Sequence, residues 1–126
     1  MKKNVRFYKC SICGNIVGLI EGDASHLTCC CKQMDEMIAN ITDASLEKHV
    51  PVYERMNEEI IVRVGELNHP MENDHYIMWI AQVTDNRTIR ARLFPGQVPE
   101  VKFPYVAGST LYAYCNKHGL WQKNVD

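Results

Sequence analysis

The stretch "HYIMWIAQV", His75 to Val83, has the alternation of a β-strand. Apolar residues recur at every second position, namely Ile77, Trp79, Ala81 and Val83. Successive side chains of a strand point to opposite faces of its sheet, so these four residues share one face. The spacing predicts a half-buried strand, with one face against a core and the other in water.

Short runs of the same type occur on both sides of this strand. They are "VPVYERM" at 50–56, "EIIVRV" at 59–64, "TIRARLF" at 88–94, "PEVKFPYV" at 99–106 and "STLYAYC" at 109–115. Asp85-Asn86 and Pro95-Gly96 mark turns between strands. The pattern supports at most one helical turn, near Asp43 to Glu47. Six or seven short antiparallel strands in about 75 residues indicate a β-sandwich.

The composition bounds the class of protein. The chain has 126 residues, which fits one ordinary domain or one domain with a small appendage, and its 46% hydrophobic and 23% charged residues are typical of a globular protein. The formal net charge of −1 comes without any basic run, so we expect no nucleic-acid partner. No apolar stretch approaches the roughly 20 residues of a membrane span.

The first segment, residues 1–37, differs from the rest of the chain, 38–126. It holds five of the six cysteines and few apolar residues. A segment below about 40 residues usually needs a metal, disulfides or a partner chain to fold. The start "MKKNVRFYKC" lacks the apolar segment of a signal peptide, so we expect a cytoplasmic protein with reduced thiols. The clustered cysteines are therefore predicted to bind a metal ion.

Two cysteine runs supply the donors of this first site. Cys10 and Cys13 form a C-x-x-C turn followed by Gly14, and the run "TCCCK" begins fifteen residues after Cys13. Four thiolates around one ion form a tetrahedral site for zinc or iron, and this chemistry favours neither metal. Adjacent ligands require a bent backbone, because neighbouring side chains of an extended chain diverge. One cysteine of the triple Cys29 to Cys31 is surplus to four.

A second group of donors is spread over the β-rich segment. Each member lies at the end of a predicted strand, where the loops of a sandwich can converge. The members are His49, His69, His75, Cys115 and His118. Four imidazoles and one thiolate suit iron or copper, whereas five ligands exceed the usual four of zinc. An octahedral metal with five protein ligands keeps one position for a small molecule.

Six motifs in this order closely resemble the desulfoferrodoxin-type superoxide reductases. The motifs are "YKCSICGNIV", "CC", "EKHVPV", "VGELNHPMENDHYIMWI", "FPGQVPEVKF" and "YCNKHGLW", which together span essentially the whole chain. The resemblance implies a mainly β fold with two parts. These are a desulforedoxin-like metal-bound domain at 1–37 and an immunoglobulin-like antiparallel β-sandwich at 38–126.

The resemblance also implies two iron ions, carried over position by position. An Fe(Cys)4 site would use the head cysteines Cys10, Cys13, Cys29 and Cys30. An Fe(His)4(Cys) site would use His49, His69, His75 and His118 as equatorial ligands and Cys115 as the axial ligand. Relatives usually carry Gly or Asn at the position of Cys31. All four head cysteines are present, which indicates the two-iron form.

The implied reaction is the one-electron reduction of superoxide to hydrogen peroxide without release of oxygen, for oxidative-stress defence. Lys48 would attract the anion and order the water that supplies a proton, and Glu47 would act as sixth ligand of Fe(III). We expect Asn116 to donate a hydrogen bond to the Cys115 sulfur. The resemblance further suggests a rubredoxin-like electron donor and a homodimer.

Two other interpretations of these donors can be distinguished by metal analysis. "YCNKH" near the end of a sandwich resembles the C-x-x-H corner of blue-copper proteins, which use two histidines, one cysteine and a weak axial methionine. No methionine follows His118 here, and two histidines would be unexplained. A zinc-stabilised interaction module would account for the cysteines but not for the histidines.

Overall fold

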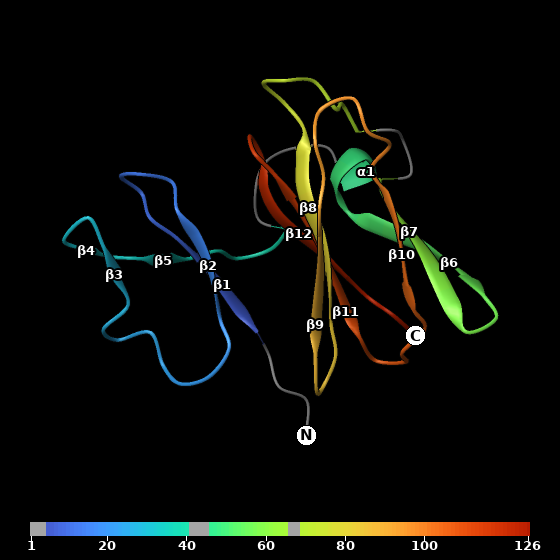
Figure 1. Cartoon of the computed structure of the whole chain (residues 1–126), viewed down its shortest axis with the longest axis horizontal. Helices are drawn as coiled ribbons and strands as arrows, with labels where there is room; N and C mark the ends of the chain where they lie inside the picture. Colours follow the sequence, from blue (N-terminus) through green and yellow to red (C-terminus); the bar gives the residue numbers. More distant parts are fainter. Residues whose placement is uncertain (1–4, 41–45, 66–68) are drawn as a thin grey trace.

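The computed structural model describes residues 5–40, 46–65 and 69–126, apart from the side chains of Leu46 and Glu47. Within these ranges the chain is almost entirely β, with twelve strands and one helix of a single turn. A small N-terminal head lies beside a larger body (Figure 1). No helix in the described part of the chain is long and apolar enough to cross a membrane.

The head contains a three-stranded antiparallel sheet and a short hairpin. The sheet has the order β2-β1-β5, and the hairpin pairs β3 with β4. The strands are β1 (Arg6–Lys9), β2 (Ile16–Leu19), β3 (Thr28–Cys29), β4 (Lys32–Gln33) and β5 (Asp35–Glu36). Among the described residues of the head, the buried cluster between these strands consists of Tyr8, Cys10 and Met34, which is a small core, as the few apolar residues of this segment indicate.

The body is a sandwich of two antiparallel sheets. One has the order β10-β7-β6 and the other β12-β11-β8-β9. Their strands are β6 (Pro51–Met56), β7 (Glu59–Val64), β8 (Ile77–Val83), β9 (Thr88–Arg92), β10 (Glu100–Pro104), β11 (Thr110–Cys115) and β12 (Gly119–Asn124). Side chains from both sheets fill the space between them, including Ile60, Val62, Ile80, Phe103 and Leu111.

All six predicted strands are present, and the structure adds β12, which the sequence pattern did not reveal. The single helix, α1, spans Leu46–His49. The helical turn predicted near Asp43 therefore lies partly outside the described residues, because 41–45 are not described.

The predicted half-buried face of β8 is wrong in two respects. Ile77 packs in the sandwich core, whereas Trp79 and Ala81 belong to a cluster on the opposite face. The pairing with β11 shifts register there, since Tyr114 pairs with Trp79 but Cys115 pairs with Ile77. The residue left without a partner in β8, Met78, forms a β-bulge, which reverses the alternation of side chains along the strand. Both faces of β8 are buried because the head covers the outer one.

Aromatic side chains join the head to this outer face. The ring of Phe7 in β1 lies 5.1 Å from that of Trp79 and 5.2 Å from that of Tyr112, between ring centroids. Trp79 in turn stacks on Tyr114 at 5.7 Å. The ammonium group of Lys9 donates a hydrogen bond of 3.0 Å to the Tyr114 hydroxyl.

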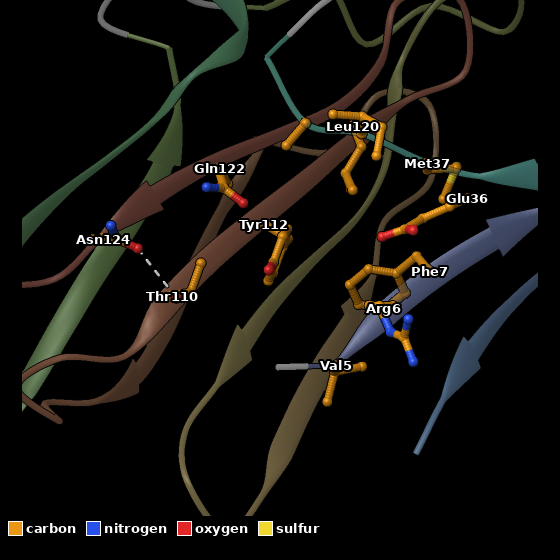
Figure 2. A pocket seen from close by; sticks show the side chains of 12 residues that line it. Val5, Arg6, Phe7, Glu36, Met37, Thr110, Tyr112, Leu120, Gln122 and Asn124 are labelled. Carbon is orange, nitrogen blue, oxygen red and sulfur yellow. Dashed lines mark hydrogen bonds between the residues drawn. The ribbon is translucent and has the colours of Figure 1, made fainter. Parts of the chain in front are cut away.

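A cleft remains beside this interface. Its volume is about 440 Å³, and β1, the segment 36–39 and strands β11 and β12 line it. Figure 2 shows Phe7 of β1 on the side of the cleft opposite Tyr112 and Leu120.

Phe7 tests how far this interface contributes to stability. We expect Phe7→Ala to lower the free energy of unfolding by about 3 kcal/mol, because it removes a buried ring from the contact. The matched control is Phe94→Ala, since Phe94 is 52% exposed whereas Phe7 is 7% exposed. The control should change stability by less than about 1 kcal/mol in urea unfolding. Equal losses in the two variants would show that the head does not depend on Phe7.

Candidate metal centres

His49 is placed by the junction of α1 and β6. The helix ends at His49, and β6 begins at Pro51. Proline lacks an N–H and favours an extended conformation in the residue before it, so the helix cannot continue past this point. The imidazole is buried, 3% exposed, and stacks on the indole of Trp121 in β12 at 4.9 Å.

His69 and His75 lie on the segment between β7 and β8. The Nδ1 of His69 lies 2.7 Å from the Pro70 carbonyl oxygen, to which it donates. Because Nδ1 carries the proton for this hydrogen bond, the lone pair that can bind a metal is on Nε2. The backbone of His75 forms an isolated bridge with Glu72. The Nε2 atoms of both histidines are buried and have no hydrogen-bond partner among the described residues.

Cys115 and His118 lie at the turn between β11 and β12. Cys115 is the last residue of β11 and is completely buried. Its partner across the hairpin is Gly119, whose φ of 82° is one that other residues rarely adopt. The turn places the Cys115 sulfur 3.9 Å from the Nδ1 of His118.

The four imidazoles form a closed ring of nearly perpendicular planes. Neighbouring centroids are separated by 4.6 Å for His49 and His69, 4.9 Å for His69 and His75, 5.0 Å for His75 and His118, and 4.8 Å for His118 and His49. The interplanar angles range from 76° to 87°. In this cyclic arrangement, one nitrogen of each ring lies close to a nitrogen of each of the others.

The donor atoms of these five residues fit one metal ion. One nitrogen from each histidine and the Cys115 sulfur all lie within 4.8 Å of one another. The Nε2 of His49 and the Nδ1 of His118 are only 3.0 Å apart. Buried polar atoms without a partner are costly, so the Nε2 atoms of His69 and His75 indicate a bound ligand. A transition-metal ion at this centre would satisfy both nitrogens.

Lowered pKa values keep two of the histidines in the neutral form that binds a metal. Burial lowers the pKa of His69 to about 4, although the hydrogen bond to the Pro70 carbonyl opposes this shift. Burial, together with the charges of His118 and Lys117, also lowers the pKa of His75. Neutral imidazoles are the form that binds a metal. Burial raises the pKa of the Cys115 thiol, while the backbone N–H groups of Lys117 and His118 oppose that shift.

The second cluster lies in the head. The sulfurs of Cys10, Cys13, Cys29 and Cys30 lie within 4.8 Å of one another. Those of Cys13 and Cys29 are 3.5 Å apart. The N–H groups of Cys13 and Ile12 point at the Cys10 sulfur and lower the pKa of its thiol to about 6. A set of four sulfurs fits a tetrahedral ion.

The structure places Cys31 outside this cluster. Cys30 and Cys31 have φ angles of 54° and 60°, in the left-handed region that non-glycine residues rarely adopt. This turn is the bent backbone that adjacent ligands require, and it lets Cys29 and Cys30 meet at one point. The two clusters, one of four sulfurs and one of four imidazoles with a sulfur, are consistent with two iron centres.

The predicted catalytic pair lies next to His49. Lys48 is exposed in α1, one residue before the buried His49. The side chain of Glu47 lies outside the described residues. Lys117 is also exposed, and its charge acts on both His75 and Cys115. The sequence indicates Lys117 only by its place between two donors.

The expected hydrogen bond from Asn116 to the Cys115 sulfur is replaced by bonds to other partners. Its side chain donates to the Asp74 carbonyl oxygen at 3.0 Å and accepts from the Tyr76 N–H at 3.0 Å. The pairing of this turn with the loop around His75 is a tertiary contact. The sequence pattern therefore did not reveal it.

Comparisons with known proteins agree with this architecture. The family model described as Desulfoferrodoxin matches residues 41–124, and that of the Desulfoferrodoxin N-terminal domain matches residues 2–37. The chain is 46% identical over 122 residues to a desulfoferrodoxin of Syntrophotalea carbinolica, covering 96% of this chain and 97% of the relative.

Two solved structures are similar in fold. The superoxide reductase from Treponema pallidum superimposes with a TM-score of 0.76 at 28% identity, covering 96% of this chain and 99% of that one. The superoxide reductase (1Fe-SOR) from Giardia intestinalis superimposes with a TM-score of 0.56 at 28% identity, covering 64% of this chain and 98% of that one. The family models and the full-length relative confirm the resemblance of the motifs: this chain belongs to the desulfoferrodoxin family.

Proposed function

We propose that this chain is a superoxide reductase. One superoxide, one electron and two protons give one hydrogen peroxide, with no oxygen released. The observation that carries this proposal is the ring of four imidazoles with a buried cysteine sulfur. Solved proteins of similar fold are superoxide reductases, which supports the same assignment.

The ligands that we propose for the reacting metal are His49, His69, His75, Cys115 and His118. Iron held by this set would supply the single electron and a coordination position for a small anion. The Cys115 sulfur would donate electron density to this iron, by analogy with thiolate-ligated haem. The N–H groups of Lys117 and His118 that point at this sulfur moderate its donation.

Exposed cations next to the ring attract the substrate. Superoxide is an anion, and a positive field raises both its local concentration and its rate of approach. Lys48 is exposed beside His49, and Lys117 is exposed between Cys115 and His118. We assign Lys48 the further role of ordering the water that delivers a proton. Glu47, whose side chain is not described, is proposed as the carboxylate that binds the oxidised metal after the product leaves.

The head has a separate role in this proposal. Four sulfurs saturate its ion, so the head can pass electrons but cannot bind superoxide. We propose that Cys10, Cys13, Cys29 and Cys30 hold this iron, and that the chain divides into domains at 1–37 and 38–126. A rubredoxin-like electron donor, a cytoplasmic location and a homodimer complete the proposal, on the basis of the motif resemblance.

The products of a superoxide pulse test the reaction. We expect the anaerobically reduced protein to form one hydrogen peroxide for each superoxide consumed, with no oxygen evolved. Dismutation would instead release one oxygen for every two superoxide ions. Metal analysis of the same sample should give two irons per chain. One copper, or zinc alone, would contradict the proposal and favour an electron carrier or an interaction module.

Cys13→Ser separates the two centres. Loss of one of four sulfurs should release the head iron, because the site loses a thiolate ligand. More than half of the peroxide yield in a single superoxide pulse should remain. Cys31→Ser is the matched control, since Cys31 is outside the cluster, and it should keep both irons. A Cys13→Ser protein with the body iron intact and no peroxide yield would contradict the separate roles.

Lys48→Ala tests electrostatic attraction. The second-order rate constant for superoxide should fall about tenfold at low salt, and its dependence on ionic strength should weaken. Lys123→Ala makes the same change of charge at an exposed lysine near the far end of β12, and it should leave the rate within about twofold. The measurement is pulse radiolysis across a range of ionic strengths. An unchanged salt dependence in Lys48→Ala would exclude this role.

A further inference from the structure

Asn116 lies between two donors of the body centre, yet it bonds to the loop that carries a third. Its side-chain amide donates to the carbonyl oxygen of Asp74 at 3.0 Å, and its Oδ1 accepts from the N–H of Tyr76 at 3.0 Å. Its own backbone N–H donates to the Tyr76 carbonyl oxygen at 3.2 Å. These three bonds lie on both sides of His75.

The loop around His75 has few other attachments. Both backbone groups of His75 bond within the loop, to Glu72, at 3.2 Å for its N–H and 2.9 Å for its carbonyl oxygen. Residues 72–74 are exposed. Among the described residues, the hydrogen bonds that tie the backbone of 74–76 to another segment all run to Asn116. The loop is a closed turn whose position depends on that residue.

Where the pairing of β11 with β8 ends, the hydrogen bonds of Asn116 take the place of backbone pairing between strands. The pairing of β11 with β8 ends at Cys115 and Ile77, directly after the bulge. Beyond this pair, none of the described strands pairs with the backbone of 74–76. The amide side chain carries a donor and an acceptor together, so it satisfies one group on each side of His75. Aspartate lacks the donor, and alanine lacks both groups.

His75 needs this support more than the other buried ligands. His49 is 3% exposed and stacks on Trp121, and His69 is 3% exposed and bonded to Pro70. His75 is only partly buried, and its described ring contacts are with His69 and His118. Its position is therefore set by the backbone of its loop rather than by packing.

We propose that Asn116 is a positioning residue of the body metal centre. It holds His75 at ligand distance from Cys115 and His118 by fixing the 74–76 backbone to the turn that carries these two donors. The assignment deepens the proposed function and rests on it for its catalytic meaning. It predicts that the loss of Asn116 weakens one metal centre of the molecule and leaves the other unchanged.

Metal retention in the full-length loaded protein tests this role. Iron is withdrawn from each site by increasing concentrations of a chelator, and the absorption of each centre is followed separately. Asn116→Ala should lose the body iron at a chelator activity about 10- to 100-fold lower than the parent chain, the usual effect of removing a group that orients a metal ligand. Asn116→Asp, which keeps the acceptor, should fall between the two. The head iron serves as an internal reference and should not change.

A matched control lies at the other end of the same hairpin. Asn124 accepts a hydrogen bond from the Thr110 hydroxyl at 3.2 Å, on the strand pair that also carries Cys115. Asn124→Ala removes a comparable bond far from the centre and should leave iron retention within about threefold. Amide hydrogen exchange gives a second readout, because the Tyr76 N–H should exchange faster in Asn116→Ala and not in Asn124→Ala.

The outcomes separate cleanly. Unchanged iron retention in Asn116→Ala, or an equal loss in Asn124→Ala, would overturn the role of Asn116. If Asn116→Ala does not take up iron even in the head, Asn116→Asp is used instead, and unchanged retention of its body iron would overturn the role of Asn116. Superoxide is absent from the measurement, so a chain that holds both irons without reducing superoxide would overturn the proposed function and not this assignment.

Discussion

The body of this protein depends on buried imidazole nitrogens that none of the described protein groups satisfies. The Nε2 atoms of His69 and His75 are excluded from water and have no hydrogen-bond partner among the described residues. An unsatisfied buried polar atom costs roughly 1–3 kcal/mol, and this cost is recovered when a metal ion binds. The end of the sandwich is therefore built for a ligand, and loops from β7, β11 and α1 have to converge there.

The two centres differ in how far apart in the sequence their donors lie. In the head, Cys10 and Cys13 are local, and the left-handed turn at Cys30 brings the second pair of sulfurs together. Such a site needs little core, which suits a segment whose buried cluster has three members. In the body, the donors come from segments up to 69 residues apart, as for His49 and His118. Only a complete sandwich can hold them, so the larger core belongs to the centre that is proposed to carry the chemistry.

The interface between head and body touches the segments that carry both sets of donors. Lys9, next to Cys10, bonds to the hydroxyl of Tyr114, next to Cys115. Phe7, Trp79 and Tyr114 continue this contact through stacked and tilted rings. This packing explains why β8 is buried on both faces. The side chains that form this contact, Lys9 and Tyr114, each directly precede a metal ligand in the sequence, so the two parts of the chain pack together next to both sets of donors.

The sequence by itself determined the local features. Strand alternation predicted six of the seven strands of the body, and the C-x-x-C turn with its cysteine triple predicted a four-sulfur site, because these patterns depend on neighbours along the chain. Donors at strand ends were also visible. Only the tertiary structure decided which face of β8 carries Trp79 and where the Asn116 amide bonds. A one-residue bulge reverses a face and a side-chain amide can pair with either of two segments, so these outcomes depend on the register between strands that are distant in sequence.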